Sequence, residues 1–339
     1  MSFWRKSDAH KRNAPKSAKR ILVIAIGGLT EFVAVLAAAK IIRDYHVGAR
    51  ITLLTVEPLR ELAEKCPYFD LVEADGKPTE PQATTQLITR LRRAKYDMIY
   101  DLKGSNRTNS YFHAMRPWPP LWSGTAPGCS HPFAPPEQPI HQLDRLTMQL
   151  SAAGAEISGQ LLPDMTWVRA AFRDAPRLQP GYFGIRGPYI LLLPKDGAAR
   201  DGERWPSRKY IELARRIADQ GATPVMLGGP EERGVGAALA EVEPRAKNLV
   251  ARADIFQIAA LAERAAFAVG EQGPYMHVAA ACGVSSVILL PASADPEIEA
   301  PRGRRGVVTI QAPVLAETPA PQVDQQMRNC GAYGHPTAA

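Results

Sequence analysis

The strongest constraint on the fold is a repeated alternation of short apolar runs with longer helical stretches. Residues 21–26 form an unbroken apolar run rich in β-branched side chains, as a strand buried on both faces requires. Gly27 and Gly28 separate it from a helical stretch at 32–45. Further strands are expected at 51–56, 71–72 and 97–101, and helices at 61–65, 82–94 and 141–154. This βαβ repetition predicts a parallel sheet covered by helices on both faces.

The alternation restarts after a segment rich in proline and glycine. Strands are expected at 189–193, 223–227, 266–269 and 286–290, with helices at 207–220, 255–264 and 276–281. The pattern therefore predicts an α/β protein with two Rossmann-like domains, whose parallel sheets face an inter-domain cleft. Ligands of such sheets bind outside the carboxyl ends of the strands.

A length of 339 residues suits two domains with separate cores. The composition, 45% hydrophobic and 22% charged, is too apolar for a disordered chain. The predicted divisions are a basic tail, a first domain, a linker, a second domain and a C-terminal tail, at residues 1–20, 21–170, 171–188, 189–315 and 316–339. Between 116 and 139 the periodicity gives way to a long irregular loop, which favours a working surface.

The net charge of +7 is concentrated at the N-terminus. Residues 1–20 carry seven basic side chains and one acid, a balance of +6, which leaves +1 for the rest of the chain. A basic body of the kind that binds nucleic acid is therefore not expected. The tail has no apolar periodicity and is expected to be disordered; it could attract anionic lipid head groups or simply aid solubility.

The N-terminal sequence also resembles a secretory signal peptide, because a basic segment precedes an apolar one that ends in Ala37-Ala38-Ala39. Glu31 interrupts that apolar region and Lys40 closes it, which favours a strand, turn and helix of a cytosolic protein. No later stretch reaches the ~20 apolar residues that span a bilayer. Four widely spaced cysteines without C-x-x-C spacing favour reduced thiols.

One group of cysteine, histidine and aspartate residues suggests a metal site, but metal ligation is the less favoured interpretation. Cys129, His131, His141 and Asp144 could be drawn as a metal site, but loop histidines that only form hydrogen bonds are commoner. We expect neither a metal nor a cofactor. Without a G-x-G-x-x-G sequence after the first strand or a P-loop lysine, a nicotinamide dehydrogenase and a P-loop kinase are both disfavoured.

Two strand-to-helix turns are the candidate functional sites. Gly27 and Gly28 could approach a phosphate or serve only the turn, and Glu31 lies at the amino end of the following helix. There the positive helix end keeps a carboxylate ionised, as a general base needs, although a solvated carboxylate without a role is the alternative. The second turn, at 269–283, ends a strand in Gly273-Pro274 and opens a small-residue helix whose free N–H groups suit a diphosphate. His277 there could equally be a packed core residue.

Several ordered motifs together resemble glycosyltransferase family 9, the lipopolysaccharide heptosyltransferases, in the version seen in alphaproteobacteria. The resemblance covers about residues 21–310. The motifs are the opening strand, turn and helix, Pro67-Tyr68-Phe69-Asp70, Tyr100-Asp101-Leu102 with Ser105 and Arg107, Trp122-Ser123-Gly124 with 128–132, Trp205-Pro206, Leu227-Gly228-Gly229-Pro230 and the turn at 270–277.

This resemblance implies a GT-B fold and an inverting, metal-independent transfer of a sugar from a nucleoside diphosphate donor of the ADP-heptose type. Glu31 takes the place of the family's aspartate base, and Glu232 that of the acid at the donor ribose. The implied donor-binding residues are Lys195, Arg200, Arg204, Gly228, Gly229, Glu232, Gln272, Gly273, Pro274, Met276 and His277. The implied acceptor-binding residues are Gly27, Gly28, Lys103, Ser105, Arg107, Trp122 and His131.

Two positions depart from the family's pattern. Glu203 stands near a position where the family has a basic residue before Trp-Pro, and Gln272 replaces an aspartate that contacts the sugar. The Gly-Pro pair of the turn is also shifted back by one residue. Losing a diphosphate cation costs several kcal/mol unless another cation serves; Lys195, Arg200 and Arg204 lie on the same loop.

The sequence thus favours a cytosolic glycosyltransferase that acts on a lipopolysaccharide or other glycolipid at the inner face of the membrane. The basic tail and the Trp-rich loop at 117–133 would contact the anionic surface. The alternative is a pseudo-glycosyltransferase that keeps the fold for binding or assembly, since donor positions are altered. A nucleotide-sugar epimerase or nucleotide-binding regulator is a third, which lacks a motif of its own.

Overall fold

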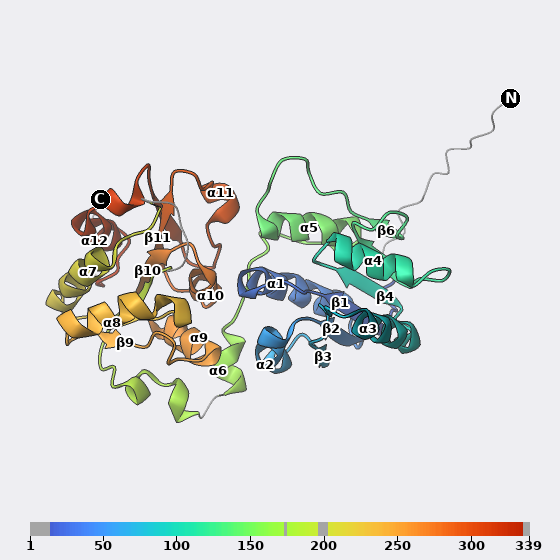
Figure 1. Cartoon of the computed structure of the whole chain (residues 1–339), viewed down its shortest axis with the longest axis horizontal. Coiled ribbons are helices and arrows are strands. Elements are labelled where there is room, and N and C mark those ends of the chain that lie inside the picture. The colour runs from blue at the N-terminus through green and yellow to red at the C-terminus, as the bar shows by residue number, and fades with distance from the viewer. Residues whose placement is uncertain (1–13, 173–174, 196–202, 335–339) are drawn as a thin grey trace.

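The computed structural model describes residues 14–172, 175–195 and 203–334, which form two α/β domains (Figure 1). The first domain is built on a six-stranded parallel sheet in the order β3-β2-β1-β4-β5-β6. Its strands are β1 (Arg20–Ile24), β2 (Arg50–Leu54), β3 (Leu71–Glu73), β4 (Met98–Asp101), β5 (Leu121–Gly124) and β6 (His131–Pro132). Central β1 is buried after its first residue, which explains its unbroken apolar run.

Helices cover both faces of this sheet. They are α1 (Leu29–Tyr45), α2 (Arg60–Lys65), α3 (Pro81–Ala94), α4 (Asn106–Ala114) and α5 (Gln142–Ala152). The apolar side chains of α1, α2 and α5 contribute to one core cluster, and those of α3 and α4 to another. A short 3-10 helix, η1 (Glu57–Leu59), precedes α2, and α6 (Trp167–Ala171) ends the domain.

The second domain repeats the plan with parallel strands in the order β12-β11-β10-β7-β8-β9. Its strands are β7 (Tyr189–Leu193), β8 (Thr223–Met226), β9 (Lys247–Asn248), β10 (Phe267–Glu271), β11 (Ser286–Pro291) and β12 (Val307–Ala312). Its helices are α7 (Ser207–Asp219), α8 (Arg233–Val242), α9 (Ile255–Arg264), α10 (Pro274–Ala281), α11 (Pro296–Glu299) and α12 (Ala320–Asn329), with 3-10 helices η4 (Pro230–Glu232) and η5 (Leu315–Glu317). The two sheets and their helices confirm the predicted fold class.

The two domains meet through α1 and α10, which pack against each other. Residues 32–39 of α1 are buried without a break, so neighbours cover this part of the helix on every side. One continuous apolar cluster accordingly includes α1, α5 and α2 of the first domain and α9 and α10 of the second. Both helices begin at the carboxyl ends of their sheets, so this contact brings the two strand-to-helix turns together.

Two short strands replace part of the irregular loop that was predicted at 116–139. β5 pairs with β4 in the register Ile99↔Trp122, and β6 extends the sheet by Ser123↔His131. β5 has the sequence Leu-Trp-Ser-Gly and β6 has only His-Pro, so neither shows a strand periodicity. Their pairing is decided by the neighbouring strand rather than by local propensity.

The ends of the chain are also more ordered than predicted. Residues 1–13 of the predicted tail lie outside the described residues, but Ala14 is buried and its N–H donates to the Ala153 carbonyl over 2.7 Å. The C-terminal segment 316–339 is not simply a tail, because α12 packs on α7 and buries Val323 and Met327. The predicted linker 171–188 contains η2 (Pro176–Leu178) and η3 (Pro180–Phe183), and η2 packs on α9.

Candidate functional site

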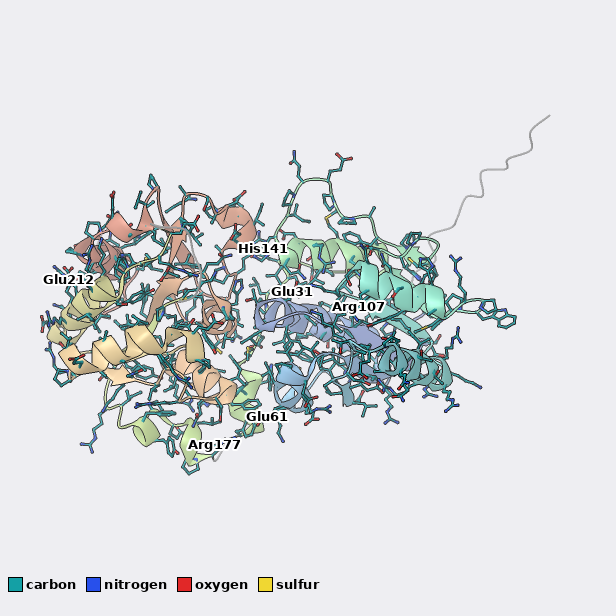
Figure 2. The ribbon with its side chains drawn as sticks, viewed as in Figure 1. Glu31, Glu61, Arg107, His141, Arg177 and Glu212 are labelled. Carbon is teal, nitrogen blue, oxygen red and sulfur yellow. The ribbon has the colours of Figure 1, made fainter. Side chains whose placement is uncertain are left out.

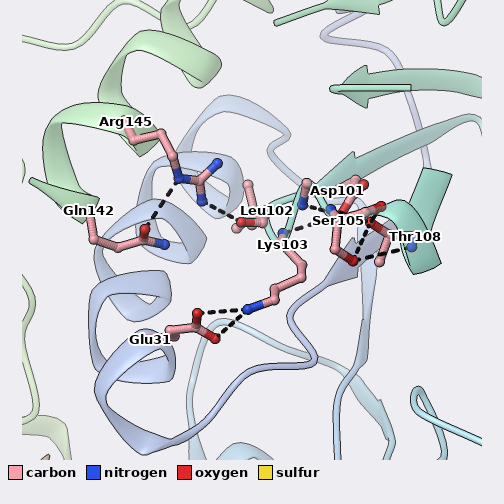
Figure 3. A network of polar contacts seen from close by, with 9 residues as sticks. Glu31, Asp101, Leu102, Lys103, Ser105, Thr108, Gln142 and Arg145 are labelled. Atoms are coloured by element: carbon pink, nitrogen blue, oxygen red, sulfur yellow. Dashed lines mark hydrogen bonds and ion pairs between the residues drawn. The ribbon is translucent and has the colours of Figure 1, made fainter. Parts of the chain in front are cut away.

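Glu31 occupies the first turn of α1, where the β1–α1 turn opens at the carboxyl edge of the first sheet. The Lys103 ammonium donates to both of its carboxylate oxygens, with Nζ 2.7 Å from Oε1 and 3.0 Å from Oε2 (Figure 3). The side chain of Glu31 is 42% exposed and that of Lys103 is 32% exposed, so the carboxylate remains open to solvent on one side. Together with Gln142 and Arg145 they line a small cavity of about 40 Å³.

Gly27 is the residue that lets the Glu31 carboxylate lie against the turn. A Cβ atom at this position would stand 1.5 Å from Oε2 of Glu31, so any side chain would displace the carboxylate. Gly28, the N-cap of α1, meets nothing within 4 Å and has extended backbone angles. The close approach at Gly27 therefore serves the carboxylate, whereas nothing in the described structure requires glycine at 28.

A buried polar network holds the segment that carries Lys103. The Asp101 carboxylate, fully buried at the end of β4, accepts the backbone N–H groups of Lys103 at 3.2 Å and Gly104 at 3.0 Å. Burial raises the pKa of Asp101 to about 6, although these hydrogen bonds stabilise the carboxylate and oppose the shift. From α5, the Arg145 guanidinium donates to the Leu102 carbonyl over 2.5 Å (Figure 3). No local sequence signal indicates this role of Arg145, because Leu102 precedes it by 43 residues.

The second domain presents a cavity of about 250 Å³ at the carboxyl ends of β7, β10 and β11. Lys195, which follows β7, passes beside Gly273, where a Cβ would lie 3.8 Å from three of its side-chain carbons. This contact places the side-chain stem of Lys195 next to the N-cap of α10. Gln272 and Glu203 also line the cavity; the Gln272 amide donates to Glu299 over 2.6 Å, and Glu203 contacts the Ser293 hydroxyl at 3.3 Å.

A buried carboxyl group, Glu271, forms the floor of this cavity. It is 3% exposed and accepts hydrogen bonds from the Trp205 backbone N–H at 3.2 Å and the Tyr210 hydroxyl at 3.1 Å. The Arg204 guanidinium lies 3.9 Å from its Oε2 atom. Burial raises the pKa of Glu271 to about 7, although the Trp205 N–H and the charge of Arg204 oppose the shift. The Trp-Pro element thus positions Arg204 at the cavity.

The glycine turn after β8 lies beside the same helix. The Gly229 N–H donates to Oε2 of Glu232 over 2.6 Å, and Glu232 is 8% exposed. A Cβ at Gly229 would lie 3.1 Å from the Tyr275 hydroxyl, and one at Gly228 would lie 2.9 Å from the Cβ of Glu232. The turn at Gly228-Gly229 and the turn at 273–277 therefore form adjoining parts of one surface.

A third cavity, of about 160 Å³, joins the two halves. Glu31 and His141 line it from the first domain, and Gln272, His277 and Arg302 from the second. Glu31 and His141 both lie on the side of the first domain that faces the second (Figure 2). Burial lowers the pKa of His277 to about 4, so this imidazole is neutral at physiological pH. The predicted base and the predicted diphosphate turn therefore reach one inter-domain cavity.

Two contacts connect the domains across the mouth of this cavity. His141 caps α5 by accepting the Leu143 N–H at Nδ1, which leaves the Nε2 hydrogen to donate to the Ala300 carbonyl over 3.1 Å. The Arg302 guanidinium donates to Asp144 over 2.7 Å. For His141, hydrogen bonding was favoured over metal ligation from the sequence. The partners of His141 and Asp144 belong to the other domain, which the sequence did not indicate.

The side chains of Trp122 and Met276 were predicted to contact ligands, but both are buried in the core. Trp122 is fully buried in the first core, where it packs on Phe112, and Met276 is fully buried in the inter-domain cluster. Neither side chain can touch a ligand in this conformation. Both were included because they belong to motifs that carry the resemblance to the family.

Four other predicted residues lie away from the three cavities or outside the described residues. Ser105 caps α4 by accepting the Thr108 N–H, and exposed Arg107 donates to the Pro78 carbonyl over 2.7 Å. His131 is 5% exposed and contacts the Ser130 hydroxyl at 2.9 Å. Arg200 lies outside the described residues. Pro274 begins α10 directly beside the cavities.

Within residues 14–172, 175–195 and 203–334, no group of three His, Cys, Asp or Glu side chains is arranged to hold a metal ion. In the same ranges, no helix combines the length and the apolarity that crossing a membrane requires.

The comparisons with known proteins agree with the fold and the motifs. The model of Glycosyltransferase family 9 (heptosyltransferase) matches residues 141–322, more than half of the chain. No curated protein matches the chain in sequence.

Solved structures match nearly the whole chain. A glycosyltransferase family 9 protein from Veillonella parvula is 18% identical, with a TM-score of 0.78 over 94% of this chain and 99% of its own. The Escherichia coli ADP-heptose lipopolysaccharide heptosyltransferase II is 17% identical, with a TM-score of 0.73 over 92% and 98%. Escherichia coli heptosyltransferase WaaC with ADP is 18% identical, with a TM-score of 0.71 over 92% and 99%. The two-domain GT-B fold is therefore shared with these proteins.

Proposed function

Because the chain belongs to glycosyltransferase family 9, we propose that it transfers a sugar with inversion from a nucleoside diphosphate donor to a glycolipid acceptor. The donor is of the ADP-heptose type and the acceptor is a lipopolysaccharide or a related glycolipid. Two structural relatives are described as heptosyltransferases, and WaaC was determined with ADP. The observation that carries the proposal is the cavity shared by Glu31, Gln272 and His277, because it joins a carboxylate of one domain to the predicted diphosphate turn of the other.

Glu31 is the general base of this proposal. Its carboxylate takes the proton of the acceptor hydroxyl as that oxygen forms a bond to the anomeric carbon of the donor sugar. The bond between the anomeric carbon and the diphosphate breaks on the opposite face, and the nucleoside diphosphate leaves with the electron pair. Lys103 holds the carboxylate through both oxygens, and each oxygen keeps a second lone pair for the acceptor hydroxyl.

The leaving diphosphate is stabilised by cations of the chain and by the amino end of α10. Lys195 lies beside the N-cap Gly273, and Arg204 lines the same cavity. Backbone N–H groups at a helix amino end and positively charged side chains both stabilise developing phosphate charge. We propose that these cations take over from the basic residue that Glu203 replaces. In the same proposal Glu232 contacts the donor ribose and Gln272 the sugar.

We also propose that the protein works in the cytoplasm, at the inner face of the membrane. Residues 1–20 carry a balance of +6, which attracts anionic lipid. A catalytically impaired binding protein is the alternative that the test must separate, since Glu203 and Gln272 depart from the family's pattern.

Calorimetric titration with ADP and UDP tests the donor site. Lys195→Ala or Arg204→Ala should weaken nucleoside diphosphate binding roughly tenfold to a hundredfold, because a charge-assisted bond contributes about 1.5–3 kcal/mol. Arg200→Ala tests the third predicted cation of the same loop in the same titration. Arg215→Ala, an exposed arginine on α7 outside the cavities, is the matched control and should bind like the wild type.

A wild-type protein that binds no nucleoside diphosphate would overturn the donor proposal and favour the non-catalytic alternative. Equal losses in Arg215→Ala and the loop variants would show that the effect comes from net charge and not from the site. A thermal-shift panel of ADP-, UDP-, GDP- and CMP-sugars then identifies the nucleotide, since a ligand at 100 times its Kd stabilises by ~2.7 kcal/mol.

A further inference from the structure

Trp118 is the most exposed large apolar side chain of the described residues, with 89% of its surface accessible. It stands in the loop at 115–120, which connects α4 to β5 and projects from the end of the first domain that lies away from the second (Figure 1). The neighbouring prolines Pro117, Pro119 and Pro120 restrict the backbone of this loop. A single exposed apolar side chain is common on protein surfaces, so the surroundings of Trp118 decide whether it marks a contact site.

The loop borders a surface cavity of about 570 Å³ with a strongly basic rim. Arg92, Lys95 and Arg116 line it and are exposed. Arg92 also donates to the backbone carbonyls of Ala114 and Arg116, so it fixes the base of the loop as well as supplying charge. We call the surface formed by Arg92, Lys95, Arg116 and Trp118 the Trp118 patch.

The one acidic residue that lines this cavity is already engaged. Oδ2 of Asp97 accepts the backbone N–H groups of Lys19 at 2.8 Å and Arg20 at 2.9 Å. These bonds also attach the end of the basic segment 1–20 to the rim of the cavity. The exposed residues Lys19 and Arg20 therefore lie at the same rim as the cations of the patch.

The patch lies at the opposite end of the first sheet from the candidate active site. Asp97 and Pro120 immediately precede β4 and β5, whereas Lys103 follows the carboxyl end of β4. A four-residue strand spans roughly 13 Å at its usual rise. The patch and the inter-domain cavity are therefore separate surfaces with different lining residues.

We propose that the Trp118 patch docks this protein on an anionic lipid bilayer. Tryptophan favours the boundary between head groups and acyl chains, and each neighbouring cation gains energy from anionic head groups. Charge complementarity selects this occupant, because three exposed cations and an exposed indole share one surface with a single, engaged acid. Docking at this patch rests on the proposed function, which places the protein at the inner face of the membrane, but it uses a surface separate from the candidate active site.

Flotation of the full-length chain with vesicles tests the proposal. Binding is measured on phosphatidylcholine vesicles with and without phosphatidylglycerol, and it should require the anionic lipid and weaken as salt is added. Lys95→Gln with Arg116→Gln should lower partitioning roughly 30-fold, at about one kcal/mol per cation. Trp118→Ala should lower it by about tenfold or more, because it removes the apolar part of the contact.

Matched controls separate the patch from general effects. Tyr182→Ala removes another exposed aromatic side chain, 64% accessible, from η3. Arg215→Gln with Arg305→Gln removes two exposed cations of the second domain. Both controls should bind vesicles like the wild type, and all variants should keep the wild-type melting temperature because the changed side chains are exposed.

Three results would overturn the proposal. The controls could lose as much binding as the patch variants, or deletion of residues 1–13 could abolish binding that the patch variants retain. Trp118→Ala could instead halve the molecular mass in solution, which would make the patch an interface between two copies of the chain. Because the vesicles carry no donor or acceptor, the result is independent of whether the protein transfers a sugar.

Discussion

The buried carboxyl group of Glu271 should make the stability of the second domain depend on pH. Its usual pKa is 4.5, and burial raises the folded-state pKa to about 7. Between these values the unfolded chain has lost the proton that the folded chain still holds, so the free energy of unfolding falls as pH rises. The loss is complete above about pH 7, and the interval corresponds to about 3 kcal/mol at 1.36 kcal/mol per pKa unit.

Glu271→Gln removes this titration while it keeps the shape of the side chain and an oxygen that accepts the Trp205 N–H. At pH 4.5 the variant should resemble the wild type. Above pH 7 it should be more stable by about 3 kcal/mol, which raises the melting temperature of a domain of this size by about 6–12 °C. Scanning calorimetry from pH 4.5 to 8 measures the difference between variant and wild type.

Glu243→Gln is a control of opposite sign. Arg245 bonds to the Glu243 carboxylate at 2.8 Å and lowers its pKa, so this pair stabilises the protein at neutral pH and loses that effect as pH falls through the lowered pKa. The control variant should therefore be less stable than the wild type at neutral pH and approach it in acid. If the stability difference between Glu271→Gln and the wild type did not change with pH, Glu271 would not be a buried carboxyl group with a raised pKa.

Three further changes test the site and the fold. Gly27→Ala should lower the rate of sugar transfer about a hundredfold or more, without changing nucleotide affinity in calorimetry, because its Cβ would displace the Glu31 carboxylate. Lys103→Gln should change stability by only about 0.2–1 kcal/mol in urea unfolding, since the ion pair is partly exposed, while transfer slows because the base loses its position. Met327→Ala should cost about 2–5 kcal/mol in the same assay, because Met327 is fully buried where α12 meets the second core.

The central strands were predictable because they are buried on both faces. β1 and β7 have unbroken apolar sequences, which only a covered parallel strand requires. β6, with two residues, and α12, with a polar sequence, depend on contacts with β5 and α7 that no local window contains. Their existence is decided by tertiary packing and not by propensity.

The candidate site was predictable where a strand end and a helix start coincide. Glu31 and the turn at Gly273 were found in this way, and the fold brings both to the inter-domain cavities. Arg145 and Arg302 were missed because each acts on a partner distant in sequence. Met276 was included because a sequence motif shows a position but not the direction in which its side chain packs.

Glu31→Gln tests the central claim most directly. The substitution keeps size and hydrogen-bonding capacity but removes the basic carboxylate, so a general base should be revealed by turnover and not by donor binding. The comparison measures kcat for sugar transfer to a glycolipid acceptor, together with the calorimetric Kd for the nucleoside diphosphate. The account predicts a kcat lower by ~10²- to 10⁴-fold with a Kd close to that of the wild type. A variant that transfers sugar at the wild-type rate would contradict it.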